Sequence, residues 1–257
     1  MPVQQIGECH ICGRVGPLSF EHVPPRKAFN DRPVIRARFE DLLGIGPDEP
    51  IRGEYQQRGM GDYTLCPGCN NKTGGWYGSE FVKWCYQGFD ILLRAQGRPT
   101  FIYLYYLLPL RIIKQIIVML FSANGPEFRR ANPELVHFVL NKEEKNLSPK
   151  YRIYTYYTVS SRLRSSAVSG LVNINTNEVF VFSELSYFPF GYIMTFDSRP
   201  PDQRLLDITH FVNYGYNEFA VKTINIPVLP THTWFPADFR TREEILSQAQ
   251  DDTRRSR

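Results

Sequence analysis

The sequence has no apolar run long enough to cross a membrane without interruption. Its most hydrophobic stretch is 101–121, and Pro109, Arg111, Lys114 and Gln115 interrupt it. A charge at the centre of a bilayer is costly, so we expect a buried strand or turn followed by a core helix, and no membrane partner. The first ten residues also lack an apolar run, so we expect no signal peptide.

Cysteines are few, and their number is odd. The chain has five cysteines in 257 residues; four form two Cys-x-x-Cys pairs and Cys85 is left over. An odd number fits a disulfide framework poorly, and paired motifs in a chain of this length indicate metal binding in a reducing cytoplasm. We expect Cys85 to be buried and unreactive.

Internal repeats, low-complexity segments and a large net charge are also missing. The composition is 42% apolar and 22% charged, which is typical of a globular protein and excludes a disordered one. A net charge of +4 tolerates an anionic partner without requiring one. No helix-turn-helix or similar module is visible, so the sequence gives no support for a specific DNA recognition site.

The strongest motif is the pair of Cys-x-x-Cys sequences formed by Cys9 and Cys12 and by Cys66 and Cys69. Two intervening residues allow a tight turn that directs both sulfurs to a common point, so each pair can bind one side of a zinc ion. Four thiolates leave no open coordination position, which predicts a structural zinc and not a catalytic one.

Local patterns around these cysteines predict the order strand, strand, helix. A strand is expected at 18–23 because Pro24 and Pro25, which cannot donate to a sheet, end it. A long, basic and turn-rich connection with one helical turn near 39–44 leads to a second strand at 62–65. From Asn71 the apolar residues recur at helical spacing, and the sequence around 97–99 ends that helix.

Beyond a boundary expected near 96–100, the pattern predicts further helices and then strands. The fold class is therefore α+β, with a unit at 1–98 and a companion domain of unknown role at 99–257. Asn124 and Asn132 are expected to cap helices. The expected elements of the companion domain are helices within about 109–145, an antiparallel β-rich part at 151–230 with a hairpin at 175–177, and a helix at 241–250 opened by a capping box.

Residues 7–85 resemble the HNH endonuclease family, which has a ββα-metal fold. In that family an acid–histidine pair ends the first strand, and a zinc-bound Cys-x-x-Cys leads into an Asn or His at the start of the helix. Here Glu21-His22 is followed by Val-Pro-Pro, and the sequence CPGC is followed by Asn70. The resemblance implies a zinc-clipped ββα unit. The companion domain is then expected to bind substrate, sense a signal or mediate homo-oligomerisation.

The resemblance also implies a function, which is hydrolysis of DNA phosphodiester bonds, in a setting such as restriction or antiphage defence. His22 is expected to act as the general base. Glu21 and the amide oxygen of Asn70 are expected to hold Mg²⁺ or Mn²⁺, because hard cations prefer oxygen ligands. The candidates for binding the substrate phosphate are Arg26, Lys27 and Lys72.

The sequence departs from the family pattern in several places. Glu21 replaces the usual Asp, and the separation from His22 to Asn70 is long. No Asn precedes the second cysteine pair, where Asp62 is the candidate to brace the histidine loop. Either Asn70 or Asn71 could be the ligand, with Asn71 more typical of a helix cap. Neighbouring strand residues point to opposite faces, so Glu21 and His22 converge only if the strand breaks there.

A different class of function is also consistent with the motif. A non-catalytic zinc-ribbon adaptor would bind nucleic acid or protein through the same cysteines, but it would not need a histidine and an asparagine beside them. RNA is not excluded as a substrate, because the aromatic-rich strands could stack unpaired bases. Other candidates have plain structural interpretations: His10 is expected to be exposed, and the core is expected to contain His137, His210, His232, Trp76 and Trp84.

Overall fold

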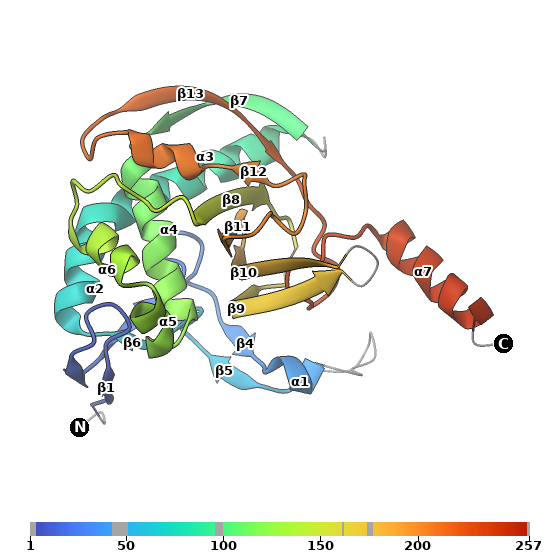
Figure 1. The fold of residues 1–257 in the computed structure, drawn as a ribbon, viewed down its shortest axis with the longest axis horizontal. Coiled ribbons are helices and arrows are strands. Elements are labelled where there is room, and N and C mark those ends of the chain that lie inside the picture. Colours follow the sequence, from blue (N-terminus) through green and yellow to red (C-terminus); the bar gives the residue numbers. More distant parts are fainter. Residues whose placement is uncertain (1–3, 43–50, 96–99, 161, 174–176, 256–257) are drawn as a thin grey trace.

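The computed structural model describes residues 4–42, 51–95, 100–160, 162–173 and 177–255. It has mixed helix and sheet structure, and every sheet among these residues is antiparallel (Figure 1). The predicted α+β class is therefore confirmed. The predicted boundary and the hairpin tip fall mainly on 96–99 and 174–176, which lie outside the described residues.

Three short antiparallel strand pairs make up the first part of the chain. The strand predicted at 18–23 is β3 (Ser19–His22), and it pairs with β6 (Gly61–Leu65), which contains the strand predicted at 62–65. The remaining elements are β1 (Ile6–Glu8) with β2 (Val15–Pro17), β4 (Val34–Arg36) with β5 (Glu54–Gln56), and the helical turn α1 (Phe39–Leu42).

The helix after the second cysteine pair starts earlier than predicted. Helix α2 spans Pro67–Thr73, a π-helical turn, η1, spans Gly74–Gly78, and α3 spans Ser79–Ala95. Proline suits the first position of a helix because the amide hydrogen it lacks would have no partner there. Asn71 therefore lies inside α2, and the prediction that it caps the helix is wrong.

The hydrophobic stretch at 101–121 is a strand followed by a core helix, as predicted. Strand β7 (Thr100–Leu107) leads into α4 (Pro109–Ala123), in which every residue from Leu110 to Phe121 except Arg111 is buried. None of the helices within the described ranges is long and apolar enough to span a membrane. Two short helices follow, α5 (Pro126–Ala131) and α6 (Pro133–Leu140). The helix predicted to reach residue 145 therefore ends earlier.

The second half of the chain forms a five-stranded sheet in the order β12-β8-β11-β10-β9, beside a two-stranded sheet of β13 and β7 (Figure 1). The predicted capping box is present, because Thr241 and Glu244 each accept a hydrogen bond from the other's backbone N–H. The elements are β8 (Tyr151–Tyr157), β9 (Arg164–Asn173), β10 (Glu178–Tyr187), β11 (Phe190–Phe196), β12 (Leu206–Asp207), the 3-10 helix η2 (Thr209–Asn213), β13 (Ala220–Pro227) and α7 (Arg242–Arg255).

One continuous hydrophobic core joins the parts on either side of the predicted boundary. Trp84 of α3 is fully buried and stacks on Phe190 of β11, with ring centroids 4.6 Å apart. Its indole N–H donates to the hydroxyl of Tyr192 at 3.0 Å. The helix of the first unit is thus packed directly on the sheet of the companion part, which fixes the two relative to each other.

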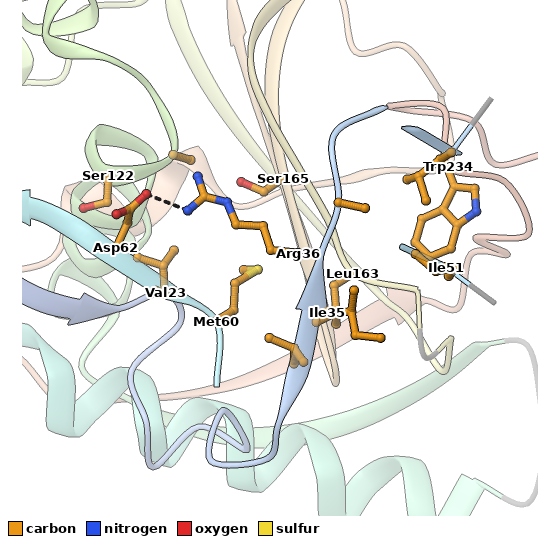
Figure 2. Close-up of a pocket in the computed structure, with 15 residues that line it drawn as sticks. Val23, Ile35, Arg36, Ile51, Met60, Asp62, Ser122, Leu163, Ser165 and Trp234 are labelled. Carbon is orange, nitrogen blue, oxygen red and sulfur yellow. Dashed lines mark hydrogen bonds and ion pairs between the residues drawn. The ribbon is translucent and has the colours of Figure 1, made fainter. Parts of the chain in front are cut away.

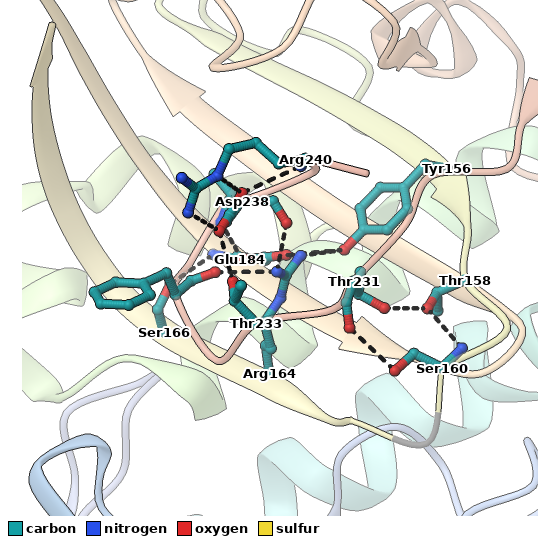
Figure 3. Close-up of polar contacts among 12 residues, drawn as sticks. Tyr156, Thr158, Ser160, Arg164, Ser166, Glu184, Thr231, Thr233, Asp238 and Arg240 are labelled. Atoms are coloured by element: carbon teal, nitrogen blue, oxygen red, sulfur yellow. Dashed lines mark hydrogen bonds and ion pairs between the residues drawn. The ribbon is translucent and has the colours of Figure 1, made fainter. Parts of the chain in front are cut away.

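A buried polar network fastens the chain segment 231–240 to the sheet (Figure 3). The guanidinium of Arg164 donates to the carboxylate of Glu184 at 2.6 Å, and both side chains are almost fully buried. The Glu184 carboxylate also accepts from the Tyr156 hydroxyl at 2.8 Å and from the Ala237 N–H at 2.7 Å. A buried ion pair is tolerated only when most of its remaining polar atoms find partners. These bonds supply partners for both carboxylate oxygens, and Arg164 also donates to the Phe235 and Asp238 carbonyls, so that Nε is the guanidinium nitrogen left without one.

The histidines differ from the prediction in their exposure. His137, His210 and His232 are all exposed and not packed in the core. His137 reaches Glu144 at 3.3 Å, and His210 packs edge-on against Phe211. Apolar neighbours in sequence did not bury them: His137 and His210 lie on the exposed faces of α6 and η2, and His232 lies in the connection between β13 and α7.

Candidate functional site

The four paired cysteines converge on one point. The sulfur atoms of Cys9, Cys12, Cys66 and Cys69 all lie within 4.8 Å of one another. The Cys12 and Cys66 sulfurs are 3.8 Å apart, and a tetrahedral zinc with Zn–S bonds of about 2.3 Å requires a separation of about 3.8 Å. The cluster could therefore hold a metal ion such as zinc, as predicted, and Cys85 is buried elsewhere in the core.

Local backbone geometry explains why the sulfurs meet. The first pair sits in a turn between β1 and β2, which is closed by a hydrogen bond from the Gly13 N–H to the Cys9 carbonyl at 2.9 Å. Gly13 has φ +73, which glycine adopts without strain. His10, in the same turn, donates its N–H to the Thr64 carbonyl, and its ring Nδ1 lies 3.0 Å from the Phe121 carbonyl. This ring is therefore only half exposed.

Hydrogen bonds and burial shift the pKa values of three of these thiols. A hydrogen bond between Cys9 and Cys69 raises the pKa of Cys69 and lowers the pKa of Cys9 to about 4, and burial raises the pKa of Cys12. A negative charge on Cys9 also disfavours a second one on Cys69. A bound dication would supply the positive charge that lets both of these thiols lose their protons.

The strand β3 directs Glu21 and His22 to opposite faces. In the pairing with β6, Glu21 lies opposite Asp62 and His22 lies opposite Gly61, so the strand stays regular to its end. The Glu21 side chain is 6% exposed, and its carboxylate accepts hydrogen bonds from Thr64 at 3.3 Å and from Ser122 of α4. Burial raises the pKa of Glu21 to about 7. Of its two carboxylate oxygens, Oε2 is therefore engaged by Thr64 and Ser122.

The imidazole of His22 is oriented by a backbone carbonyl. Its Nε2 lies 3.0 Å from the carbonyl oxygen of Arg58. A carbonyl can only accept, so Nε2 carries the hydrogen and Nδ1 of the neutral ring is left with the lone pair. Burial, with the nearby charges of Arg26 and Arg58, lowers the pKa of His22. Asp62 does not brace this ring; its carboxylate binds Arg36 and the Tyr63 N–H on the other face.

A buried asparagine holds the loops around His22. Asn30 is fully buried, and its amide donates to the carbonyls of Pro24 at 2.6 Å and Met60 at 2.7 Å. Its Oδ1 accepts from the Met60 N–H at 2.7 Å and from the Tyr187 hydroxyl at 3.1 Å. Asn30 thus joins the loop after His22 to the segment that carries the Arg58 carbonyl.

Asn70 lies against β3. Its Nδ2 donates to the Ser19 hydroxyl at 3.0 Å and to the Phe20 carbonyl at 3.4 Å. Because the Phe20 carbonyl only accepts, the amide nitrogen must face β3. The Oδ1 of Asn70 therefore points away from the strand. This placement favours Asn70 over the exposed Asn71 as the residue with an oxygen to offer.

An open pocket of about 680 Å³ brings several of the predicted residues together. Glu21, His22, Asn70, Arg26 and Lys27 line it, whereas Lys72 does not and instead lies 4.8 Å above the ring of Trp76. The residues of the pocket that sequence reasoning missed include Lys83, Gln115 and the two glycines at the ends of the π turn, Gly74 and Gly78. The signals were present as a Gly-Gly pair inside a helix and a glutamine inside an apolar one.

A second pocket, of about 270 Å³, lies beside Asp62 of β6 (Figure 2). Arg36 and Asp62 form an ion pair across it at 2.7 Å. Ser122, which donates to Glu21, also lines it, as does Trp234 from the 231–240 segment. Asp62 therefore lines a different pocket from His22, whereas Glu21 and His22 line the same one.

The fold and the site together define a mixed α+β protein with a four-cysteine metal site beside a histidine-lined pocket. A comparison of the chain with family models, curated proteins and solved structures finds no match. The function of the site therefore has to follow from its own geometry.

Proposed function

We propose that the protein is an HNH-type endonuclease that hydrolyses phosphodiester bonds in DNA, with His22 as the general base and a zinc ion on the four cysteines as scaffold. One observation carries the proposal: His22 and Asn70 share a pocket, and the Arg58 carbonyl fixes the imidazole with its lone pair on Nδ1. A histidine with only a structural role would not need one fixed tautomer in a pocket that is also lined by Arg26 and Lys27.

The chemistry assigned to His22 is proton removal from water. The lone pair of Nδ1 takes a proton as the water oxygen attacks phosphorus. The bond from phosphorus to the 3′ oxygen breaks, and that oxygen takes a proton from solvent. The lowered pKa of His22 agrees with a neutral imidazole at cellular pH, although the assignment itself rests on the hydrogen bond to Arg58.

The substrate phosphate would be held by the positive charges at the rim of the pocket. Arg26 and Lys27 are exposed there and lie in the loop after β3, just beyond Pro25. Lys83 of α3 lies across the pocket, where Glu80 partly neutralises it at 2.9 Å. Cations placed around the transferring phosphoryl group stabilise the charge that develops in the transition state.

The divalent cation implied by the resemblance fits this geometry only in part. Glu21 and Asn70 both line the pocket that contains His22, but Oε2 of Glu21 already accepts hydrogen bonds from Thr64 and Ser122. No step is therefore assigned to a cation. A requirement for Mg²⁺ or Mn²⁺ stays part of the proposal as a property to be measured.

The position of Glu21 also favours a second candidate, a non-catalytic zinc-ribbon adaptor that binds nucleic acid or protein. An adaptor needs the four-cysteine cluster but no acidic ligand beside His22. The two candidates differ in a simple way, because an adaptor would bind nucleic acid equally well with and without the imidazole and would cut nothing.

Nicking of supercoiled plasmid DNA tests the proposal. The wild-type protein is incubated with Mg²⁺, with Mn²⁺ and without either, and zinc content is measured in each sample so that loss of the structural ion is not mistaken for loss of a catalytic one. His22→Ala should lower the nicking rate by ~10²-fold or more. His210→Ala is the matched control, because that histidine is accessible to solvent but lies on η2 and does not line the pocket. Full activity of the His22→Ala protein would exclude the nuclease assignment.

A further inference from the structure

A single glutamine interrupts the face of α4 that looks toward the pocket. Gln115 is 3% exposed, and its Oε1 has no hydrogen-bond partner among the described residues. The residues on either side along the helix, apart from Lys114, are buried aliphatic side chains. Lys114 is accounted for, because it donates to the Phe138 and Asn141 carbonyls. Gln115 has no such structural explanation.

A buried amide oxygen without a partner costs stability, because it gives up its hydrogen bonds to water and gains none in return. A leucine or methionine at this position would fill similar space without that cost. Buried polar atoms without partners are uncommon in folded proteins, and each one calls for a reason. The reason offered by the structure is the location of Gln115 in the wall of the pocket that contains His22 and Asn70.

The pocket changes in character from rim to floor. Arg26, Lys27 and Lys83 are exposed at the rim. Gln115 lies deeper, beneath the π turn: a Cβ added to Gly78 would come 3.9 Å from its Oε1. Phe20 and Val82 provide apolar lining between these levels. A volume of about 680 Å³ lies within the range of about 300–1,000 Å³ found for small-molecule sites.

A ligand that fits this gradient has an anionic part for the rim, a flat apolar body for the walls and hydrogen-bonding edges for the floor. A nucleotide has all three. In a duplex the base edges are paired and stacked, so they cannot reach an amide this deeply buried next to a backbone phosphate. Only an unpaired or extruded base can enter such a pocket, where an aromatic side chain can stack on it and an amide can bind its polar edge.

We propose that this pocket takes one unpaired nucleotide, with the phosphate at Arg26 and Lys27 and the base against Phe20 and Gln115. The substrate class of the proposed nuclease is then single-stranded or locally unpaired DNA and not regular duplex. This inference rests on the proposed function, since the same pocket contains His22.

The experiment measures binding and stability together. The His22→Ala protein is used so that nothing is cut, and its affinity is measured by fluorescence anisotropy for a labelled 12-nucleotide single strand and for the same sequence as duplex. The single strand should bind ~10-fold more tightly, and adding Gln115→Met should lower that affinity ~10-fold, as expected for loss of a base contact. Gln115→Met should also raise the melting temperature, because an unpaired amide has been removed.

Two further variants make the result decisive. Gln87→Met is the matched control: its amide is satisfied by both backbone groups of Tyr106, so it should lose stability and leave affinity unchanged. Gly74→Leu should block the pocket and keep the fold, because Gly74 has ordinary helical angles and a Cβ there meets nothing within 4 Å.

The outcomes separate this inference from the proposed function. Equal affinity for duplex and single strand, or a Gln115→Met protein that is less stable and binds as before, would overturn the unpaired-nucleotide site and leave the nuclease proposal standing. Failure to bind any of the labelled DNA would overturn both.

Discussion

The side-chain amide of Asn30 binds both backbone groups of Met60, with the Met60 N–H donating to Oδ1 at 2.7 Å and Nδ2 donating to the Met60 carbonyl at 2.7 Å. A second Nδ2 hydrogen bond goes to Pro24, two residues after His22. This one side chain therefore sets the separation between the histidine loop and the segment that presents the Arg58 carbonyl. It performs the bracing role that the sequence led us to expect of Asp62.

Replacing Asn30 should affect both stability and the proposed activity. Asn30→Ala removes four buried hydrogen bonds and leaves their backbone partners without replacements, so the free energy of unfolding should fall by ~2–4 kcal/mol. If His22 is the general base, nicking activity should fall further than the loss of folded protein accounts for, because Arg58 no longer fixes the imidazole. Urea denaturation and plasmid nicking at a temperature where the variant is folded check both expectations.

Tyr187→Phe is the control for that variant. It removes only the hydroxyl that donates toward Asn30 and the Phe29 carbonyl, so a loss of ~1 kcal/mol and near-normal nicking are expected. Asn30→Ala protein that is destabilised but nicks at the wild-type rate per folded molecule would show that Asn30 supports the fold alone.

Zinc should be bound at one ion per chain, and its removal should destabilise the N-terminal strands and α2. Cys69→Ser takes away one thiolate from the first turn of α2, so zinc content should drop and the free energy of unfolding should fall by at least ~3 kcal/mol. Metal analysis and thermal unfolding, with and without a zinc chelator, check this result.

Cys85→Ser is the matched control for the zinc experiment, because Cys85 is also buried but lies outside the cluster. It should keep a full complement of zinc even though burying a hydroxyl costs some stability. Loss of zinc from this variant, or full retention in Cys69→Ser, would contradict the assignment of the site.

The features that could be predicted from the sequence are those specified by neighbouring residues. The Cys-x-x-Cys pairs, the proline that opens α4 at Pro109 and the Thr241–Glu244 capping box each act over a few residues. The strand order around the cysteines followed from the same local signals. Each of these predictions depended on spacing alone, and the described structure contains each of them.

The parts that could not be predicted depend on contacts between distant segments. Glu21 is held by Ser122, a residue 101 positions away, and this contact decides which way the carboxylate points. The Arg58 carbonyl lies in a connection whose sequence has no periodic pattern. Burial of a histidine depends on which face of its element meets the core, and apolar neighbours did not reveal that for His137.

The buried ion pair of Arg164 and Glu184 makes a prediction about stability. Glu184→Gln removes the negative charge and leaves the Arg164 guanidinium uncompensated in a site where both side chains are at most 2% exposed. Breaking one partner of such a pair costs ~3–5 kcal/mol. Asp90→Asn, which disrupts the exposed pair with Arg94 on α3, should cost less than ~0.5 kcal/mol. Similar losses for the two variants in chemical denaturation would show that the buried network contributes little.

The same network predicts a pH dependence at Asp238. Burial alone would raise the pKa of this carboxyl, but hydrogen bonds from Arg240 and Thr233 outweigh it and lower the pKa to about 2, against 3.8 for the ordinary value. The folded state therefore binds fewer protons than the unfolded state between these values, so the stabilisation is complete above pH ~4 and is lost as the pH falls toward 2.

Asp238→Asn has no carboxyl group to titrate at this position, so it cannot show this loss of stabilisation. The wild type should be more stable than Asp238→Asn by ~2 kcal/mol at pH 5, and the difference should shrink by roughly 1 kcal/mol at pH 3. Urea denaturation of both proteins at the two pH values measures the difference directly, and other carboxyl groups cancel because they are common to both. A difference that stays constant across this range would mean that Asp238 is not held as an anion by Arg240.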